Sequence, residues 1–302
     1  MKIRNIFATA IASAAAAGIG FTFYRKFTNT DSENIIIDGV PEKTADALRI
    51  ISFNLRYNDD KAGSVKDRSK ISTAIIRQYS PDSFGVQEAT GKWMDILEKS
   101  LGDKYAYVAT PRDDKGYNSE CNAVFYLKDK YNLIDSGTIW LSETPEKEFT
   151  KSFDSCCHRI ATWAVLQNKS DGKTYTHINT HLDHVSEKAR IEQTKILLDK
   201  ISQLNKTSKV VCTGDFNAEN SSEIYQKMTA ATDDSRMVAI NSDSGITFHN
   251  YGQCDENSDA AIDFIFVPKG TKVYTHKIIR NTFKGMHPSD HYPIASDMNL
   301  YE

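Results

Sequence analysis

The sequence VVCTGDFN at residues 210–217 carries the strongest structural signal in the chain. Its first half is apolar and β-branched, which is typical of a buried strand, and it ends in the polar side chains of Asp215 and Asn217. A carboxylate at the end of a buried strand is costly unless it is paired or binds a metal. This stretch therefore predicts a strand that carries functional groups to the edge of a sheet.

Five further apolar runs end in, or contain, a carboxylate, an amide or an imidazole. They lie at residues 52–55, 86–88, 178–184, 261–267 and 289–293. Singly, a cluster also fits a structural role, such as an Asx turn at Asp215 or a helix cap at Glu88. Six clusters in one chain are better explained as one constellation at a common sheet edge, where strand ends present their side chains.

Strand-like and helical segments alternate along the rest of the chain. Helices are predicted at 66–79, 93–101, 187–204 and 222–231, and strands at 48–55, 83–88, 105–110, 122–127, 138–141, 160–166, 175–182, 210–216, 262–267, 272–279 and 294–300. Eleven strands are too many for one open twisted sheet, so we expect two packed sheets with helices outside. The irregular order of the segments favours an α/β sandwich of mixed sheets (of α+β type) over a (β/α)₈ barrel.

The N-terminal residues differ from the rest of the chain. Residues 1–26 contain four basic and no acidic side chains, and residues 5–24 are uncharged. A helix of this length spans about 30 Å, so the segment is expected to be an uncleaved membrane anchor or a cleaved secretory signal, with a buried helix as the third alternative. Either of the first two exports the domain, as a secreted or a membrane-anchored protein. Residues 27–46 are predicted to form a polar tether, and residues 47–302 the functional domain.

The 302 residues have an ordinary globular composition, with 40% apolar and 25% charged residues. The net charge is −3, and it becomes −7 without the four basic residues of the N-terminal segment. Because proteins that hold nucleic acid mainly by charge have a strong basic excess, nucleic acid is a disfavoured partner. The five cysteines form no CxxC pair, which argues against a structural zinc site; we expect buried thiols, or one disulfide through Cys156 or Cys157.

The residue types in the six clusters narrow the chemistry. Carboxylates and amides without thiolates suit Mg²⁺ or Mn²⁺ rather than zinc, and such ions typically act on phosphates. Two imidazoles, His181 and His291, are suited to stabilise charge on phosphate oxygens or to protonate a leaving oxygen. The chain has no GxxxxGK[ST] loop and no GxSxG elbow, which argues against P-loop nucleotide hydrolysis and the usual serine-hydrolase arrangement.

These motifs give the chain a family resemblance. It resembles the endonuclease/exonuclease/phosphatase superfamily of metal-dependent phosphoesterases, which includes pancreatic deoxyribonuclease, inositol polyphosphate 5-phosphatases and bacterial sphingomyelinases. The resemblance extends from about residue 47 to 300 and is most specific in GDFN at 214–217 followed by SDHYP at 289–293. SFN at 52–54, QE at 87–88, TH at 180–181 and ID at 262–263 complete the pattern. The resemblance implies a four-layer sandwich of two mixed β-sheets flanked by helices.

The resemblance also implies a metal site and a catalytic set. Glu88 is expected to be the principal metal ligand, with Asn54 beside it and Asp290 binding a second metal or positioning the first. The cofactor is expected to be Mg²⁺ or Mn²⁺.

The implied catalytic residues act on the attacking water and on the phosphate. Asp215 would align and deprotonate the water, while Asn217 and His181 would contact the phosphate. Asp263 would orient His291, whose imidazolium would stabilise charge in the transition state.

Three further residues are expected at the substrate, and one departs from the family pattern. Arg112 and Arg159 are expected to bind phosphate, with surface salt bridges as the alternative. Asp183 is expected to extend the site or to support it. Arg56 stands where many nuclease members place a carboxylate, so that ligand is missing here.

The sequence therefore predicts a metal-dependent hydrolase of phosphoric esters, a phosphodiesterase or a phosphatase, that acts outside the cytoplasm. A nuclease acting on extracellular DNA or RNA is the first alternative. A surface binding module that has lost catalysis is the alternative from another class. Membrane association is expected to run through residues 5–24.

Overall fold

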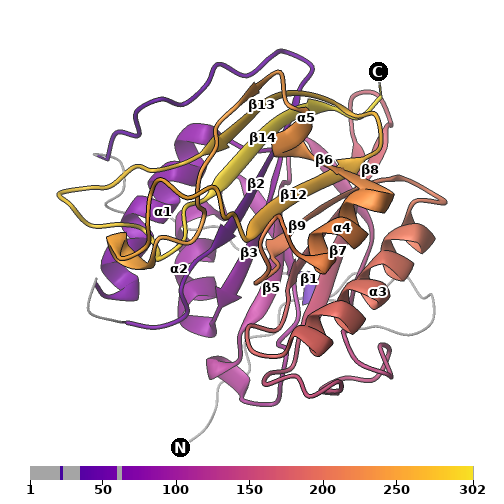
Figure 1. Ribbon diagram of the computed structural model, residues 1–302. Coiled ribbons are helices and arrows are strands. Elements are labelled where there is room, and N and C mark those ends of the chain that lie inside the picture. The colour runs from indigo at the N-terminus through magenta and orange to yellow at the C-terminus, as the bar shows by residue number, and fades with distance from the viewer. Residues whose placement is uncertain (1–20, 23–34, 60–62, 302) are drawn as a thin grey trace, which may run out of the picture.

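The structure, a computed structural model, describes residues 21–22, 35–59 and 63–301 and contains two mixed β-sheets (Figure 1). Among these residues the first sheet has eight strands, in the order β1 (Phe21–Thr22), β4 (Tyr105–Ala109), β5 (Cys121–Leu127), β3 (Ser83–Ala89), β2 (Leu48–Asn54), β14 (Ile294–Asn299), β13 (Lys272–Ile278) and β11 (Asn241–Ser242). The second has six, in the order β10 (Thr232–Asp234), β12 (Asp263–Pro268), β9 (Lys209–Asp215), β8 (Thr174–His181), β7 (Ile160–Asn168) and β6 (Tyr131–Trp140).

Helices cover the outer faces of both sheets (Figure 1). They are α1 (Val65–Tyr79) and α2 (Gly91–Leu101) on the first sheet, and α3 (Glu187–Leu204) and α4 (Glu223–Ala231) on the second. The short helix α5 (Ser235–Val238) and two 3₁₀ turns, Gly116–Asn118 and Asn250–Gly252, lie in connections. The predicted four-layer sandwich is confirmed.

Three apolar clusters hold the four layers together. Trp93 and Ile75 belong to the cluster between the helices and the first sheet, and Leu197 and Phe264 to the one between the second sheet and its helices. The third cluster, which includes Ile50 and the other residues buried between the sheets, joins the two sheets face to face. Each sheet is thus buried on both faces, which explains why its strands have long apolar runs.

The local sequence explains where the helices begin. Ser64 accepts a hydrogen bond from the backbone N–H of Asp67 at the start of α1, and Ser186 caps α3 in the same way through Ala189. The buried face of α3 includes Leu197, which lies on the apolar stripe that its sequence predicts.

Each of the predicted strands and helices is present, with differences mostly of one or two residues at the ends. The largest difference is at β6, which begins at Tyr131 rather than residue 138. This strand lies at an edge of the second sheet, and the exposed residues of its first half lack an apolar run. The short elements β10, β11 and α5 were not predicted, because two to four residues show no periodicity.

A polar network also crosses between the two sheets. His177 of β8 contacts the hydroxyl of Ser83 in β3 through Nδ1 and that of Thr213 in β9 through Nε2, at 2.8 Å each. The amide of Gln87 donates to Asn179 Oδ1 at 2.6 Å, again joining β3 to β8. These hydrogen bonds offset most of the cost of removing the groups from water, although Gln87 Oε1 is buried without a partner among the described residues.

The N-terminal segment at 1–26 lies outside the described residues, apart from Phe21 and Thr22, so the prediction of an anchor or signal stays a prediction. Among the described residues, no helix has the length and hydropathy needed to cross a membrane. Ile35 and Ile37, in the region predicted as a tether, are buried in the cluster that contains α1.

All five cysteines are free of disulfides. Cys121 and Cys212 are buried, as expected for small apolar residues, while Cys156 is exposed.

Candidate functional site

Strand register brings the predicted residues to one edge of the sandwich. β8 and β9 are parallel and pair His181 with Asp215, while the antiparallel β12 pairs Asp263 with Asp215. In the first sheet, β2 and β3 are parallel, so that Asn54 and the residues after Gln87 end at the same edge. The expected gathering of strand ends is present.

Asp215 lies at the centre of this arrangement. Its Oδ2 accepts a hydrogen bond from Asn54 Nδ2 at 2.9 Å and lies 3.4 Å from His181 Nε2 and 3.7 Å from His291 Nε2. Its Oδ1 accepts the backbone N–H of Asn217 at 2.9 Å. Burial, with the charge of Asp263 added, raises the pKa of Asp215 to about 7. A carboxylate with a pKa near neutrality is suited to accept a proton from water.

Asp263 and His291 form a buried ion pair. Asp263 Oδ2 lies 2.8 Å from His291 Nδ1, and the ring of Phe248 packs against the imidazole at 4.9 Å between centroids. Burial opposes a charge on His291, but Asp263 and Asp215 outweigh it and raise the pKa of His291 to about 10. His291 is therefore an imidazolium held in a fixed orientation, with Nε2 on the side of Asp215.

His181 is held in the opposite charge state. Burial, followed by the charges of Arg159 and Arg112, lowers the pKa of His181 well below its ordinary value. Asn217 Nδ2 lies 3.0 Å from the carbonyl oxygen of Leu182 and 3.0 Å from His181 Nε2, so the amide nitrogen is the donor in both contacts. The proton of His181 then resides on Nδ1, which is buried and has no hydrogen-bond partner within the described part of the chain. This N–H is available to an acceptor on a ligand.

The predicted metal ligands lie near one another on the first-sheet side of the site. Asn54 Nδ2 is 3.2 Å from Glu88 Oε1, and Glu88 Oε2 accepts the backbone N–H of Tyr57 at 2.9 Å. Glu88 has a positive φ of 59°, at a register irregularity between β3 and β5. Such a conformation is uncommon for a residue with a side chain and is concentrated at functional sites.

The charges at this edge fit a divalent cation. Burial, and then the charge of Glu88, raises the pKa of Asp290, although His291 and Arg56 oppose the shift. Two carboxylates this close suit Mg²⁺ or Mn²⁺. The amide of Asn54 turns its nitrogen to Glu88 and its oxygen to the backbone N–H of Arg56, so it must rotate to offer a cation its oxygen. The described residues also bring Asp215, Asp263 and His291 within metal-binding distance of one another, but a protonated imidazole has no lone pair for a metal. Glu88, Asn54 and Asp290 thus remain the predicted ligands.

The predicted substrate residues Arg159 and Arg112 lie near enough to His181 for their charges to lower its pKa. Arg159 Nη2 contacts His184 Nδ1 at 2.9 Å, and its Nη1 is buried without a hydrogen-bond partner among the residues described. Arg112 pairs with Glu120 at 2.6 Å. Asp183 uses both carboxylate oxygens to bind loop residues, including Ser186 N at 2.8 Å and Ser155 Oγ at 2.8 Å. Asp183 therefore supports the site, and its contact with substrate stays a prediction.

Sequence reasoning did not find two residues of this site. Glu120 is half-buried beside Arg112; burial raises its pKa, and Arg112, Glu88 and Arg159 are among the charges that act on it. It precedes β5, so the rule that polar groups follow strands missed it, although β5 is antiparallel to β3 and begins where β3 ends. Arg56 was noted only as a missing ligand, yet its Nε lies 3.6 Å from Asp290 Oδ2.

Comparisons with known proteins identify the family and the fold of this chain. The family model described as Endonuclease/Exonuclease/phosphatase family matches residues 51–291. An endonuclease/exonuclease/phosphatase from Bacteroides vulgatus is 32% identical, with 84% of this chain and 99% of that chain covered and a TM-score of 0.79. A mannosyl-6-phosphatase from Bacteroides thetaiotaomicron is 27% identical, with 83% and 99% covered and a TM-score of 0.78.

A more distant structure shares the fold alone. TDP2 of D. rerio, complexed with single strand DNA product, is 18% identical over 84% of this chain and 99% of that chain, with a TM-score of 0.67. No protein in the curated set matches the chain.

Proposed function

The chain belongs to the Endonuclease/Exonuclease/phosphatase family, and on that premise we propose that it is a divalent-metal-dependent hydrolase of phosphoric esters. The observation that carries this proposal is the position of Asp215, which lies within 3.7 Å of a neutral and a protonated imidazole at once. A base beside groups that can stabilise an oxyanion suits water attack on phosphorus.

Each side chain has a definite task in this reaction. Asp215 orients the attacking water and accepts its proton at Oδ2, while Asn54 and the N–H of Asn217 hold the carboxylate in place. His291 directs an N–H at the developing charge, and Asp263 keeps it protonated. His181 Nδ1–H and Arg159 Nη1 are buried donors without partners among the described residues, so they suit two of the phosphate oxygens.

Glu88, Asn54 and Asp290 would hold the divalent cation. When bound, Mg²⁺ or Mn²⁺ supplies a Lewis acid that neutralises charge on the phosphate oxygens. Glu88 presents one carboxylate oxygen on the same side as Asn54, and the buried Asp290 lies near enough for Glu88 to shift its pKa.

A phosphate monoester of a sugar is the substrate class that one relative favours. The mannosyl-6-phosphatase is 27% identical and is covered over 99% of its length. A small monoester needs contacts only with the catalytic residues and with Arg112 and Arg159. Unlike a nucleic acid, it does not need a basic protein surface.

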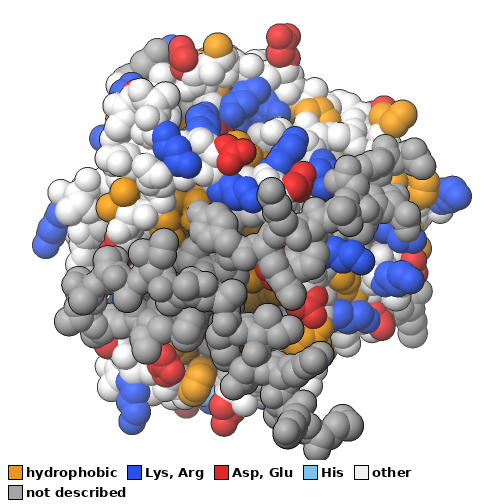
Figure 2. Space-filling view, turned by 180° about the vertical axis from the view of Figure 1, so that it is seen from behind, with side chains coloured by type: hydrophobic (Ala, Val, Ile, Leu, Met, Phe, Trp, Pro, Cys, Tyr) orange, Lys and Arg blue, Asp and Glu red, His pale blue; other side chains and the backbone are white. Residues whose placement is uncertain are grey.

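The nuclease alternative has less support. The net charge is −3, and on the described part of one face Lys and Arg side chains lie among Asp and Glu rather than in a field of one sign (Figure 2). The DNA-bound neighbour shares only the fold at 18% identity. A long polyanion would gain little from such a surface.

Asp215→Asn tests the proposed hydrolase. The substitution keeps the shape of the side chain and removes the base, so turnover of p-nitrophenyl phosphate should fall by roughly 10²- to 10⁴-fold while the unfolding midpoint changes little. Asp129→Asn, at an exposed turn, is the matched control and should keep full activity. EDTA should silence the wild type and Mg²⁺ should restore it.

The outcomes distinguish the alternatives. Full activity of Asp215→Asn would overturn the assigned base. A wild type that binds Mg²⁺ in calorimetry but turns over no ester in a panel of mannose 6-phosphate, bis-p-nitrophenyl phosphate, single-stranded DNA and RNA would favour the silent binding module instead.

We also propose that residues 5–24 direct export, as the uncharged stretch between basic residues suggests. Fractionation of cells that express the full chain should place the activity outside the cytoplasm. N-terminal sequencing of the product then separates a retained anchor from a cleaved signal, and activity confined to the cytoplasm would contradict export.

A further inference from the structure

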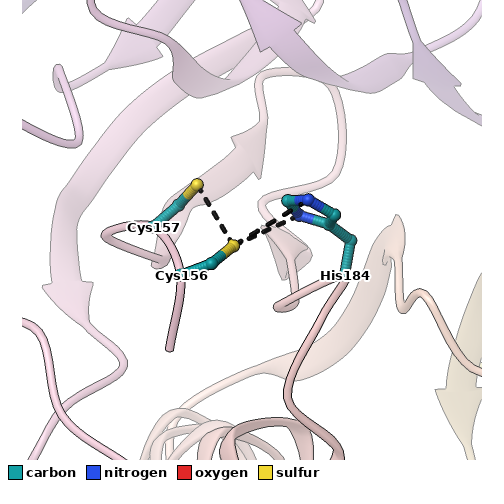
Figure 3. Close-up of side chains that lie close together, drawn as sticks. All are labelled: Cys156, Cys157 and His184. Atoms are coloured by element: carbon teal, nitrogen blue, oxygen red, sulfur yellow. Dashed lines mark hydrogen bonds between the residues drawn. The ribbon is translucent and has the colours of Figure 1, made fainter. Parts of the chain in front are cut away.

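Two thiols and an imidazole meet at the rim of the site, and the proposed hydrolysis uses none of them. Cys156 and Cys157 lie in the connection between β6 and β7, and His184 follows β8 (Figure 3). Cys156 Sγ lies 3.4 Å from Cys157 Sγ and 3.4 Å from His184 Nδ1. Cys156 and His184 are exposed and Cys157 is half-buried, so solutes can reach the group.

These distances are close to the distances between ligand atoms in a tetrahedral metal site. Zn–S bonds of about 2.3 Å and Zn–N bonds of about 2.0 Å at tetrahedral angles place two sulfurs ~3.8 Å apart and a sulfur and a nitrogen ~3.5 Å apart. All three ligand atoms lie within 4.8 Å of one another, so small side-chain rotations suffice. We propose that Cys156, Cys157 and His184 form a second cation site, separate from the hydrolytic one, that binds a soft divalent ion of the Zn²⁺ type.

Asp183 fixes the two ligand segments against each other. Its Oδ2 accepts the backbone N–H of Cys156 at 2.9 Å, and its Oδ1 accepts the backbone N–H of Val185 at 3.0 Å. One buried carboxylate thus clamps the cysteine loop to the loop that carries His184 before any cation binds. This preorganisation reduces the entropy lost when three ligands are brought together.

A redox pair is the competing interpretation of adjacent cysteines. The two sulfurs are not bonded, and Cys156 Sγ also contacts His184 Nδ1 at 3.4 Å and Asp183 Oδ2 at 3.1 Å. A disulfide would involve only the two sulfurs, whereas a cation uses all three neighbouring side chains. A cation must displace the thiol protons, so its binding releases protons and strengthens as pH rises.

The cation competes with the phosphate-site arginine for one imidazole. A neutral imidazole has a single lone pair, and His184 now offers Nδ1 to Arg159 Nη2 at 2.9 Å. A metal bound to Nδ1 uses this lone pair directly. A metal bound to Nε2 leaves the proton on Nδ1, so that Nδ1 can no longer accept a hydrogen bond. Arg159 loses its acceptor on His184 when the site fills, which links the second site to the rim of the first.

Cobalt binding tests this site without reference to hydrolysis. Co²⁺ is added to the full chain, reduced with a phosphine, in an excess of Mg²⁺ that occupies oxygen sites. We expect one equivalent of Co²⁺ with a thiolate-to-cobalt charge-transfer band in the near ultraviolet and tetrahedral visible bands, both displaced by Zn²⁺.

Three variants and a control make the test specific. Cys156→Ser/Cys157→Ser should abolish the charge-transfer band, and His184→Gln should weaken Co²⁺ binding by about tenfold or more. Cys254→Ser, at a half-buried thiol elsewhere, should change nothing. Arg159→Gln should tighten binding several-fold, because it removes both the competitor and a nearby positive charge.

Several results would overturn the proposal. They are a wild type without a thiolate band, a band that survives in the double serine variant, and a mass decrease showing that Cys156 and Cys157 form a disulfide under these conditions. Unchanged or weaker binding in Arg159→Gln would contradict the competition for His184. These readouts stay valid if the chain hydrolyses no ester, so the two proposals fail independently.

Discussion

The bond between Asp263 Oδ2 and His291 Nδ1 sets the charge of the catalytic imidazole. Burial alone would lower the pKa of His291, and Asp263 is the largest of the influences that raise it to about 10. We therefore expect Asp263→Asn to lower the pKa of His291 towards neutrality and to lower kcat by roughly 10²- to 10⁴-fold, with a small change in KM.

The pH profile separates this role from a general loss of stability. In Asp263→Asn the remaining activity should fall as pH rises through the lowered pKa of His291, whereas in the wild type this limb lies near pH 10. Asp129→Asn should keep the wild-type profile. An unaltered profile in Asp263→Asn would show that Asp263 does not control the protonation of His291.

Site residues could be predicted from the sequence where a charged side chain lies in or beside an apolar strand. Asp215 and Asp263 stand out because a carboxylate inside or beside an apolar run needs a partner. Glu120 shows no such conflict, because it precedes its strand in a polar stretch and gains its place only from the antiparallel pairing of β5 with β3. The Cys156–His184 contact joins loops 28 positions apart and has no sequence signature.

At the level of elements, the close approach of β3 to the second sheet depends on Gly85. A Cβ at this position would lie 2.3 Å from Thr213 Oγ1 and 2.6 Å from Asn179 Oδ1. Those two side chains are hydrogen-bonded to each other at 3.0 Å and cannot move apart cheaply.

Gly85→Ala should therefore destabilise the protein by about 1–3 kcal/mol, the usual cost of overpacking a core. Urea unfolding followed by tryptophan fluorescence measures the change. Gly270→Asn is the control, since Gly270 has open space around it and a positive φ that Asn tolerates. Equal stability of Gly85→Ala and the wild type would show that the sheets can separate at this point without cost.

The long elements could be predicted because each has an apolar run or a 3.6-residue period. β6 was predicted only at its C-terminal end, from residue 138, because its register against β7, rather than its own sequence, extends it back to Tyr131. The bulge that turns Glu88 out of the ladder was not predicted, since a positive φ at a glutamate follows from the surrounding strands and not from its residue type.

In the whole molecule, the two sheets meet through an interior that is partly polar. The apolar cluster between the sheets includes Ile50 and Val211, and the Ser83–His177–Thr213 chain of hydrogen bonds crosses between the same layers. The layer order followed from counting strands, but this network did not, because it requires knowing which strands of the two sheets face each other. Each hydrogen bond in this network depends on the others. A charge on any of its side chains should therefore lower the stability of the packed sheets.

This dependence predicts how stability responds to acid. Burial lowers the pKa of His177 from 6.5 to about 3, so between these values the unfolded chain holds a proton that the folded protein excludes. Stability contributed by neutral His177 is complete above pH 6.5 and is lost as pH falls towards 3, with a slope of about 1.4 kcal/mol per pH unit. His177→Gln cannot titrate and still offers hydrogen bonds, so its stability should fall less steeply with acid even if it is lower at pH 7.

Urea unfolding of both proteins at several values between pH 7 and 4 measures the two slopes. The buried His276 provides a matched comparison, because burial also lowers its pKa to about 3. Its hydrogen-bond partners are Ser235 and Ser296, and these contacts do not join the two sheets as those of His177 do. His276→Gln should therefore flatten the slope by a similar amount. The opposite outcome is that His177→Gln keeps the wild-type slope while His276→Gln flattens it. His177 would then accept a proton in the folded protein. In that case its two hydrogen bonds do not depend on a neutral imidazole.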